Sequence, residues 1–88
     1  MIVITLGKWN KKPTKEMLAE SRKLLEKEAI EGGKLLGMYW TLGRYDSVII
    51  TDEKDEKAAM KSNLMGGDMV STETLIAIPR EEAIKLLE

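Results

Sequence analysis

The segment 38–51 constrains the fold more than any other part of the chain. Two strand-like runs, 38–42 and 47–51, flank a short polar joint. Gly43 can adopt a positive φ at no steric cost, and the carboxylate of Asp46 can hydrogen-bond to its own backbone. Both features are typical of a tight connection between antiparallel strands, so the sequence predicts a β-hairpin here.

The first half of the chain predicts a strand, a helix and the first arm of this hairpin. Residues 2–8 are apolar and β-branched, as in a strand buried on both faces. Thr14 is a good helix N-cap, and apolar residues then recur at helical spacing. Gly32-Gly33 permits the left-handed conformation that ends a helix, and residues 34–42 form the second strand.

The second half predicts the same order of elements followed by a tail. Asp52 is expected to cap a second helix with an acidic first turn (Glu53, Asp55, Glu56). The remaining elements are a third strand at 47–51, a helix that ends at Gly66-Gly67, a fourth strand at 69–78, and a short tail helix opened by Pro79 that covers Arg80 to Leu87.

The order of these elements predicts the fold class. A βαββαβ chain of 88 residues forms one α+β, ferredoxin-like domain, residues 1–88. Its four-stranded antiparallel sheet has the spatial order 4-1-3-2, with two helices on one face and a short C-terminal helix in addition. The other face of the sheet is then bare in a single protomer.

The strands do not alternate cleanly between apolar and polar residues, which predicts a partner for that bare face. The first strand has Ile2, Ile4 and Leu6 on one face, but Val3 and Trp9 on the other. The second strand sets Leu36, Met38, Trp40 and Leu42 against Leu35 and Tyr39, and the fourth sets Val70, Ile76 and Ile78 against Leu75 and Ala77. A sheet face of this size covers about 350 Å². Two such faces stacked gain about 15–20 kcal/mol gross, against an association cost of about 4–15 kcal/mol, so we expect a homodimer.

Composition excludes several classes of site. The formal charge of −1 gives no general attraction to nucleic acid or to an anionic membrane. Without cysteine or histidine the chain lacks the usual ligands of zinc, copper and haem, so no metal or cofactor is expected. Neither glycine pair matches a phosphate-binding loop, and the third strand lacks the aromatic residues of an RNA-binding sheet. The apolar run Ile2–Leu6 is too short for a membrane helix, so we expect a soluble, cytoplasmic protein.

The hairpin also resembles the signature of a known family. A Leu-Gly-Lys-Trp run (Leu6–Trp9), a Tyr-Trp-Thr-Leu-Gly run (Tyr39–Gly43) and the residues Gly43, Tyr45 and Asp46 are similar to those of GYD-domain proteins. The resemblance covers nearly the whole chain. It implies a ferredoxin-like fold of the dimeric α/β-barrel group, in which two sheets close face to face, and it implies no particular reaction. An acidic-Pro step often precedes the second helix in that family, where this chain has Thr51-Asp52-Glu53.

Three aromatic residues, Trp9, Tyr39 and Trp40, are candidates for binding a flat apolar ligand; the alternative is plain packing. Tyr39 and Trp40 are adjacent in a strand, so one ring faces the helices and the other the second subunit. If Leu42 pairs with Ser47, Trp40 shares a face with Met38 and Ile49. A three-residue loop would exchange the two faces, so the sequence leaves this choice open.

Four charged or phenolic residues are further ligand-binding candidates. Arg44, Tyr45 and Asp46 could form a recognition corner beside Gly43, or Gly43 and Asp46 could simply shape the turn. Glu73 could face an apolar cavity and act as a base. Alternatively, its charge could protect an edge strand from aggregation.

Three functions remain open, and no catalytic residue is assigned. The first is a small homo-oligomeric protein that binds an apolar or aromatic molecule between sheet and helices. The second is a cofactor-independent monooxygenase-like or isomerase-like enzyme, which needs a carboxylate or tyrosine lining a cavity. The third is a purely structural assembly module, which predicts a filled interior.

Overall fold

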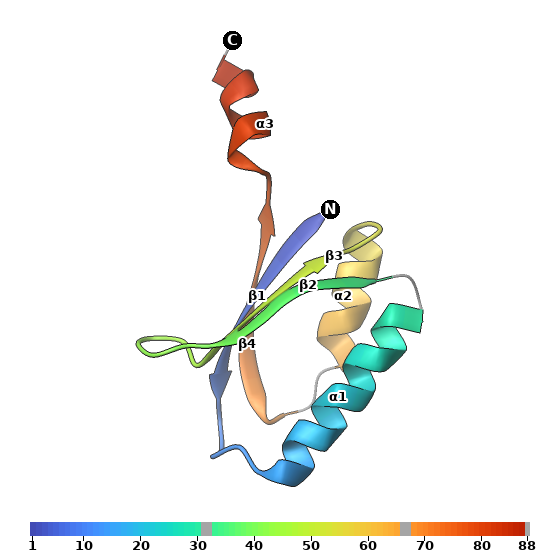
Figure 1. Cartoon of the computed structure of the whole chain (residues 1–88), viewed down its shortest axis with the longest axis vertical. Coiled ribbons are helices and arrows are strands. Elements are labelled where there is room, and N and C mark those ends of the chain that lie inside the picture. The colour runs from blue at the N-terminus through green and yellow to red at the C-terminus, as the bar shows by residue number, and fades with distance from the viewer. Residues whose placement is uncertain (31–32, 66–67, 88) are drawn as a thin grey trace.

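The computed structural model describes residues 1–30, 33–65 and 68–87. Figure 1 shows a sheet with helices on one side of it. The elements are, in chain order, β1 (Ile2–Trp9), α1 (Lys15–Ile30), β2 (Lys34–Trp40), β3 (Ser47–Asp52), α2 (Glu56–Met65), β4 (Val70–Ala77), α3 (Arg80–Ile84) and the 3₁₀ turn η1 (Lys85–Leu87). This order confirms the predicted βαββαβ pattern and its helical tail.

The sheet has the spatial order β2-β3-β1-β4, with every neighbouring pair antiparallel. The predicted order 4-1-3-2 is therefore confirmed, and the α+β, ferredoxin-like fold with it. In β1, Val3 pairs with Thr51 and Ile76, whereas Ile4 pairs with Ile50 and Leu75. Directly paired residues share a face, so these two rows lie on opposite sides of the sheet.

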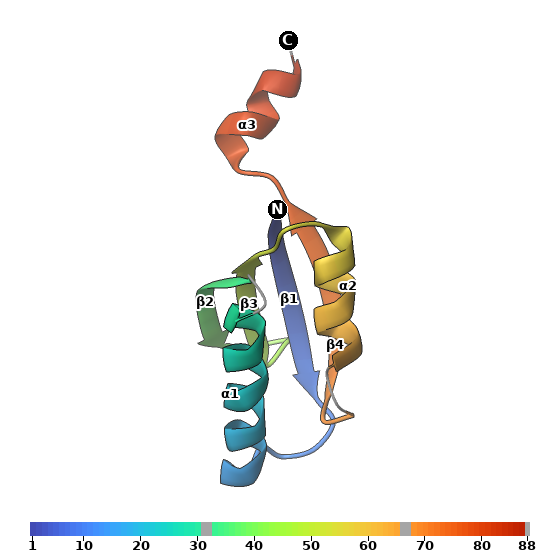
Figure 2. The same ribbon diagram turned by 90° about the vertical axis from the view of Figure 1, so that its right-hand side faces the viewer.

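Both long helices lie on the same side of the sheet (Figures 1 and 2). This side, the helix face, carries Val3 and Trp9; the opposite side, the open face, carries Ile4. The start of α1 follows the prediction, because the amide of Met17 donates to Oγ1 of Thr14 over 3.2 Å. The predicted helix ends at Gly32 and at Gly66-Gly67 lie outside the described residues.

The prediction for the start of α2 is wrong. Asp55, not Asp52, caps this helix, since its Oδ1 accepts from the amide of Ala58 over 2.9 Å. Asp52 ends β3 and binds the ammonium group of Met1 instead, over 2.9 Å. Glu53, which the sequence placed in the first turn of the helix, lies before it and is buried.

The hairpin forms with a register shifted by two residues from the one considered above. Trp40, and not Leu42, pairs with Ser47, while the loop beyond is closed by the amide of Thr41 donating to the carbonyl of Asp46 over 2.8 Å. A shift of two residues preserves the faces, so Trp40 lies on the helix face and Tyr39 on the open face. Gly43 has φ +114°, as the turn argument requires.

A bulge changes the other end of β2. The register shifts between Leu35 and Gly37, so Leu35 pairs with Thr51 and lies on the same face as Met38. The sequence placed Leu35 with Tyr39, which is wrong, because an extra residue in one strand reverses the alternation on one side of it.

The apolar core of the protomer is small. Among the described residues, Val3 and Ala59 are the only buried apolar ones, and Thr51 and Glu53 are buried with them. The tail formed by α3 and η1 extends beyond the end of the sheet (Figure 2), and Leu87 at its end is exposed. None of the described helices is of a length and apolarity that would let it cross a membrane.

Candidate functional site

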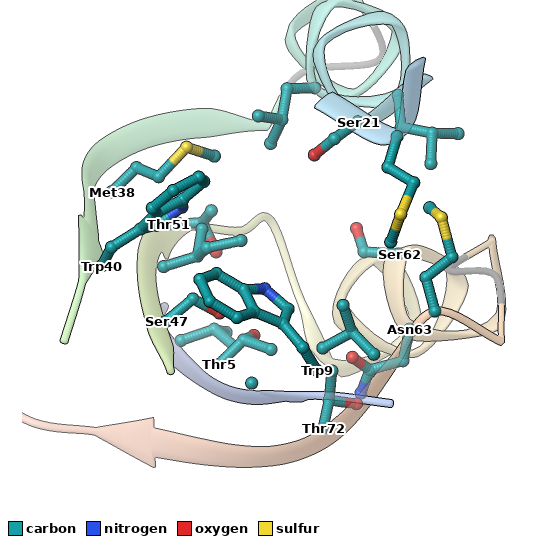
Figure 3. A pocket seen from close by; sticks show the side chains of 18 of the residues that line it. Thr5, Trp9, Ser21, Met38, Trp40, Ser47, Thr51, Ser62, Asn63 and Thr72 are labelled. Atoms are coloured by element: carbon teal, nitrogen blue, oxygen red, sulfur yellow. The ribbon is translucent and has the colours of Figure 1, made fainter. Parts of the chain in front are cut away.

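A cavity of about 270 Å³ lies between the helix face and the two long helices. We call it the helix-side cavity, and Figure 3 shows it from close by. The sheet supplies its floor, and α1 and α2 supply its walls. Apolar side chains that line it include Val3, Trp9, Met17, Leu24, Leu25, Met38, Trp40, Ile49 and Val70.

The two tryptophans of the chain meet at this cavity. Trp9 ends β1 and Trp40 ends β2, and β3 lies between these strands. Their ring centroids are 4.9 Å apart at an interplanar angle of 78°, which is the edge-to-face arrangement that aromatic pairs prefer. Both rings point into the hollow in Figure 3, so they form one aromatic end of it.

Small polar side chains interrupt the apolar lining. Thr5, Ser47 and Thr51 lie on the two central strands, while Ser21 and Ser62 come from the helices (Figure 3). The lining also includes Asn63, whose amide exchanges hydrogen bonds with Thr74 Oγ1, and a single carboxylate residue, Glu53. The cavity therefore combines an apolar body with a few hydroxyl groups and one acidic residue.

Tyr39 lies on the other side of the sheet and does not border this cavity. Its ring folds over Gly37, where an added Cβ would stand 2.9 Å from Cε2 of the ring. The residue is 57% exposed. On the open face it neighbours the apolar row that contains Val48 and Leu6.

The loop that closes the hairpin brings three of the predicted site residues together with Glu73. We call Arg44, Tyr45, Asp46 and Glu73 the loop corner. The hydroxyl of Tyr45 donates to Oε2 of Glu73, and the Arg44 guanidinium carbon lies 5.7 Å from the centroid of the Tyr45 ring. Glu73 pairs with Leu6, so this contact crosses β1 on the open face.

The contact between Tyr45 and Glu73 has an electrostatic consequence. The hydrogen bond to the Glu73 carboxylate raises the pKa of the Tyr45 phenol above its ordinary value of 10.0, with smaller contributions from desolvation and from the negative charge of Glu73. The Arg44 cation acts in the opposite direction. Tyr45 is therefore held as a neutral hydrogen-bond donor at physiological pH.

Asp46 connects the loop corner to the cavity. Its Oδ2 accepts from the amide of Trp9 over 2.9 Å, and its own amide donates to the carbonyl of Gly7 over 2.8 Å. The expected hydrogen bond from Asp46 to its own turn is thus replaced by one to β1. The carboxylate fixes the backbone of a residue whose ring lines the cavity.

The structure thus divides the predicted site residues between two places. Trp9 and Trp40 meet at the helix-side cavity, and the loop corner gathers on the opposite side. Sequence reasoning missed Glu53. Three of the four residues 53–56 are acidic, which is typical of the first turn of a helix, so the pattern places Glu53 in that turn. The signal was the strand alternation, which continues from Ile49 through Thr51 to residue 53.

Within the described ranges, no group of three or more acidic side chains is arranged to hold a metal ion.

Comparison with known proteins agrees with the fold. A search of curated proteins finds no match. The family model of the GYD domain matches residues 4–87, nearly the whole chain. The chain therefore belongs to the GYD-domain family.

Proposed function

We propose that this protein is a homodimer in which each protomer binds a small apolar or aromatic molecule in the helix-side cavity. The observation that carries the proposal is the position of Trp9 and Trp40, which form an aromatic end of a hollow between sheet and helices. Side chains of this size normally fill a core. Here they border open space.

The size and lining of the cavity suit such a ligand. Pockets for small molecules usually have a volume of about 300–1,000 Å³ and are lined by apolar and aromatic side chains with few polar groups. At about 270 Å³ this cavity lies just below that range. A cavity of this size would accept a molecule with one aromatic ring and a short alkyl chain.

The open face supports the dimer. Ile2, Ile4, Leu6, Val48 and Ile50 lie side by side on the two central strands of that face, with no helix over them. A contiguous apolar surface of several hundred Å² on a soluble protein usually marks an interface. A second copy presents the same surface, and two sheets stacked through it would bury both.

The alternatives have weaker support. The enzyme hypothesis required a carboxylate or tyrosine in the cavity, but Asp46, Tyr45 and Glu73 do not line it. Glu53 does line it, and its neighbours there include no second acid or base. The assembly hypothesis predicts a filled interior, whereas the helix-side cavity lies between the helices and the sheet.

The proposal can be tested with the two indole N–H signals in a ¹H–¹⁵N NMR spectrum, since the chain has only two tryptophans. A neutral probe, 4-phenylbutanol, is added to the intact protein. Both indole signals should shift together and saturate. Trp40→Leu should weaken the affinity at least tenfold, because it removes one wall of the aromatic end.

Tyr39→Leu is the matched control. It removes an aromatic ring from the adjacent residue, on the opposite face, and should leave the affinity for 4-phenylbutanol within about twofold. If the indole signals do not respond to the probe, the cavity is not a binding site. If Tyr39→Leu weakens binding as much as Trp40→Leu, the ligand sits between the two sheets instead.

A further inference from the structure

Glu53 is the one acidic residue among the described residues that line the helix-side cavity. The residue is 6% exposed. Its amide donates to the carbonyl of Met1 over 2.8 Å, and its carbonyl accepts from the Met1 ammonium over 2.9 Å. These two bonds extend the sheet by one residue beyond β3, so the alternation directs Glu53 to the helix face and Asp52 to the open face.

The Glu53 side chain is largely buried, but its carboxylate oxygens keep some accessible surface, because among the described residues no fully buried side-chain oxygen is left without a hydrogen-bond partner. Across residues 1–30, 33–65 and 68–87, no side chain or backbone amide forms a hydrogen bond or an ion pair with this carboxylate. The ammonium group of Met1, which donates to the Glu53 carbonyl, binds Asp52 Oδ1 and not the Glu53 carboxylate. Buried carboxylates in proteins are normally paired, because removing an ion from water costs several kcal/mol.

The acidic residue and the tryptophans lie at opposite ends of the cavity. Trp40 pairs with Ser47 at the start of β3, and Glu53 follows the last residue of that strand. The backbone from Ser47 to Glu53 is about 20 Å long. The side chains at its two ends extend toward each other, so the gap between them is shorter than this. The lining between them includes Thr51 and Ile49.

We infer that the ligand of the helix-side cavity is an elongated organic cation: an aromatic or apolar body against Trp9 and Trp40, and an ammonium group at Glu53. The inference rests on the proposed function and adds the chemical class of the ligand. An ammonium has three donors. One can bind the Glu53 carboxylate, and the hydroxyl of Thr51, two residues away on the same face, can accept another.

The charge of the ligand is what this arrangement selects. A neutral alcohol of the same shape gains the aromatic contacts but leaves the buried carboxylate without a counter-ion. A carboxylate of the same shape adds a second negative charge beside the first. Binding should therefore rank amine above alcohol above acid, since charge-assisted hydrogen bonds are about twice as strong as neutral ones.

Three matched probes test this in the full-length protein: 4-phenylbutylamine, 4-phenylbutanol and 4-phenylbutanoate at pH 7, followed by the same indole signals. The amine should bind at least tenfold more tightly than the alcohol, and the acid at least tenfold more weakly. Glu53→Gln should reduce the preference for the amine to less than threefold, with the affinity for the alcohol unchanged within twofold.

Glu56→Gln is the control, because it removes an exposed negative charge from the first turn of α2 and should preserve the amine preference. The ligand-free Glu53→Gln protein supplies a second readout: its thermal midpoint should equal or exceed that of the wild type, since a buried charge without a partner is removed. A midpoint lowered by more than 5 °C would make Glu53 a structural residue and overturn the inference.

The outcomes separate the two proposals. Failure of all three probes to move the indole signals overturns the binding function itself. Equal affinities for amine, alcohol and acid, or an amine preference that survives Glu53→Gln, leave the binding function standing and overturn the assignment of a cationic ligand.

Discussion

The two faces of the sheet differ in how many small and hydroxyl side chains their central strands carry. The helix face, which helices cover, carries Thr5, Gly7, Ser47 and Thr51 on its two central strands, interspersed with the apolar Val3, Trp9 and Ile49. The open face, which no helix of the protomer covers, carries Ile4, Leu6, Val48 and Ile50 on the same strands. In a sheet with one wet face the larger apolar residues point toward the helices.

This difference indicates what each face is for. Small and hydroxyl side chains beneath the helices leave space, and that space is the helix-side cavity. Large apolar side chains on the other face leave none, and they suit close packing against an equally flat surface. Under the proposed function, the cavity face would hold a small molecule and the open face would contact a second copy of the chain.

The strongest test of this contrast is a charge at the centre of the open face. Ile4→Asp places a carboxylate between Ile50 and Leu75. Burying that carboxylate in the proposed dimer would cost about 3 kcal/mol or more, which corresponds to at least a 100-fold weaker dimer. Sedimentation equilibrium at micromolar concentration should show monomers.

Met60→Asp is the control for Ile4→Asp, because Met60 is an exposed residue of α2 on the other side of the sheet. This variant should remain dimeric. A wild-type protein that sediments as a monomer under the same conditions would remove the distinction between the two faces at once.

Much of the architecture was readable from the sequence because it depends on local signals. Gly43 and Thr14 act where the turn and cap arguments place them, and the split βαβ order determined the sheet. Asp52 and Asp55 show the limit: both are good caps, but Asp52 binds the Met1 ammonium, in a contact between the end of β3 and the start of β1 that lie far apart in the sequence.

The candidate site was less predictable for a related reason. Strand alternation separates Tyr39 from Trp40, but which ring faces the helices depends on the length of the loop. The cavity depends on how far the helices stand from the sheet, which no residue pattern encodes. Glu53 became a cavity residue only because β3 extends past Asp52 by pairing with Met1.

A pair of glycine substitutions probes the packing of the two faces with the same added methyl group. At Gly7 a Cβ would lie 2.4 Å from Ser47 Oγ and 2.9 Å from Val70 Cγ1, both on short side chains. Gly7→Ala should therefore lower the free energy of unfolding by about 1–3 kcal/mol in a urea titration.

Gly37→Ala is the counterpart on the open face. The three atoms nearest to its Cβ would all belong to the ring of Tyr39, which is largely exposed and can turn away. We expect a loss below about 0.5 kcal/mol when both variants are measured at a concentration where the protein is monomeric. Equal losses would mean that the two faces are packed alike.

The hydrogen bond from Trp9 to Asp46 connects the two faces, and its removal should affect both. Asp46→Ala leaves the Trp9 amide without its acceptor and should cost about 1–2 kcal/mol of stability. It should also shift the Trp9 indole signal, since the backbone of that residue is no longer fixed. Arg44→Ala, in the same loop, should change neither quantity by a comparable amount.

The smallest expected effect concerns the phenol of the loop corner, and it has a definite sign. Glu73 raises the pKa of Tyr45 in the folded protein, so the folded state retains this proton at a pH where the unfolded chain has lost it. The contribution to stability is complete below pH 10 and is lost as the pH rises through the folded pKa.

An absorbance titration at 295 nm should show Tyr45 ionising at higher pH in the wild type than in Glu73→Gln, where the negative charge is gone but an oxygen acceptor remains. Identical titrations would mean that Tyr45 and Glu73 do not meet in solution. Their contact crosses β1 on the open face, so without it the hairpin loop would not cover that face. The surface available to the proposed dimer would then be larger by the area that the loop covers.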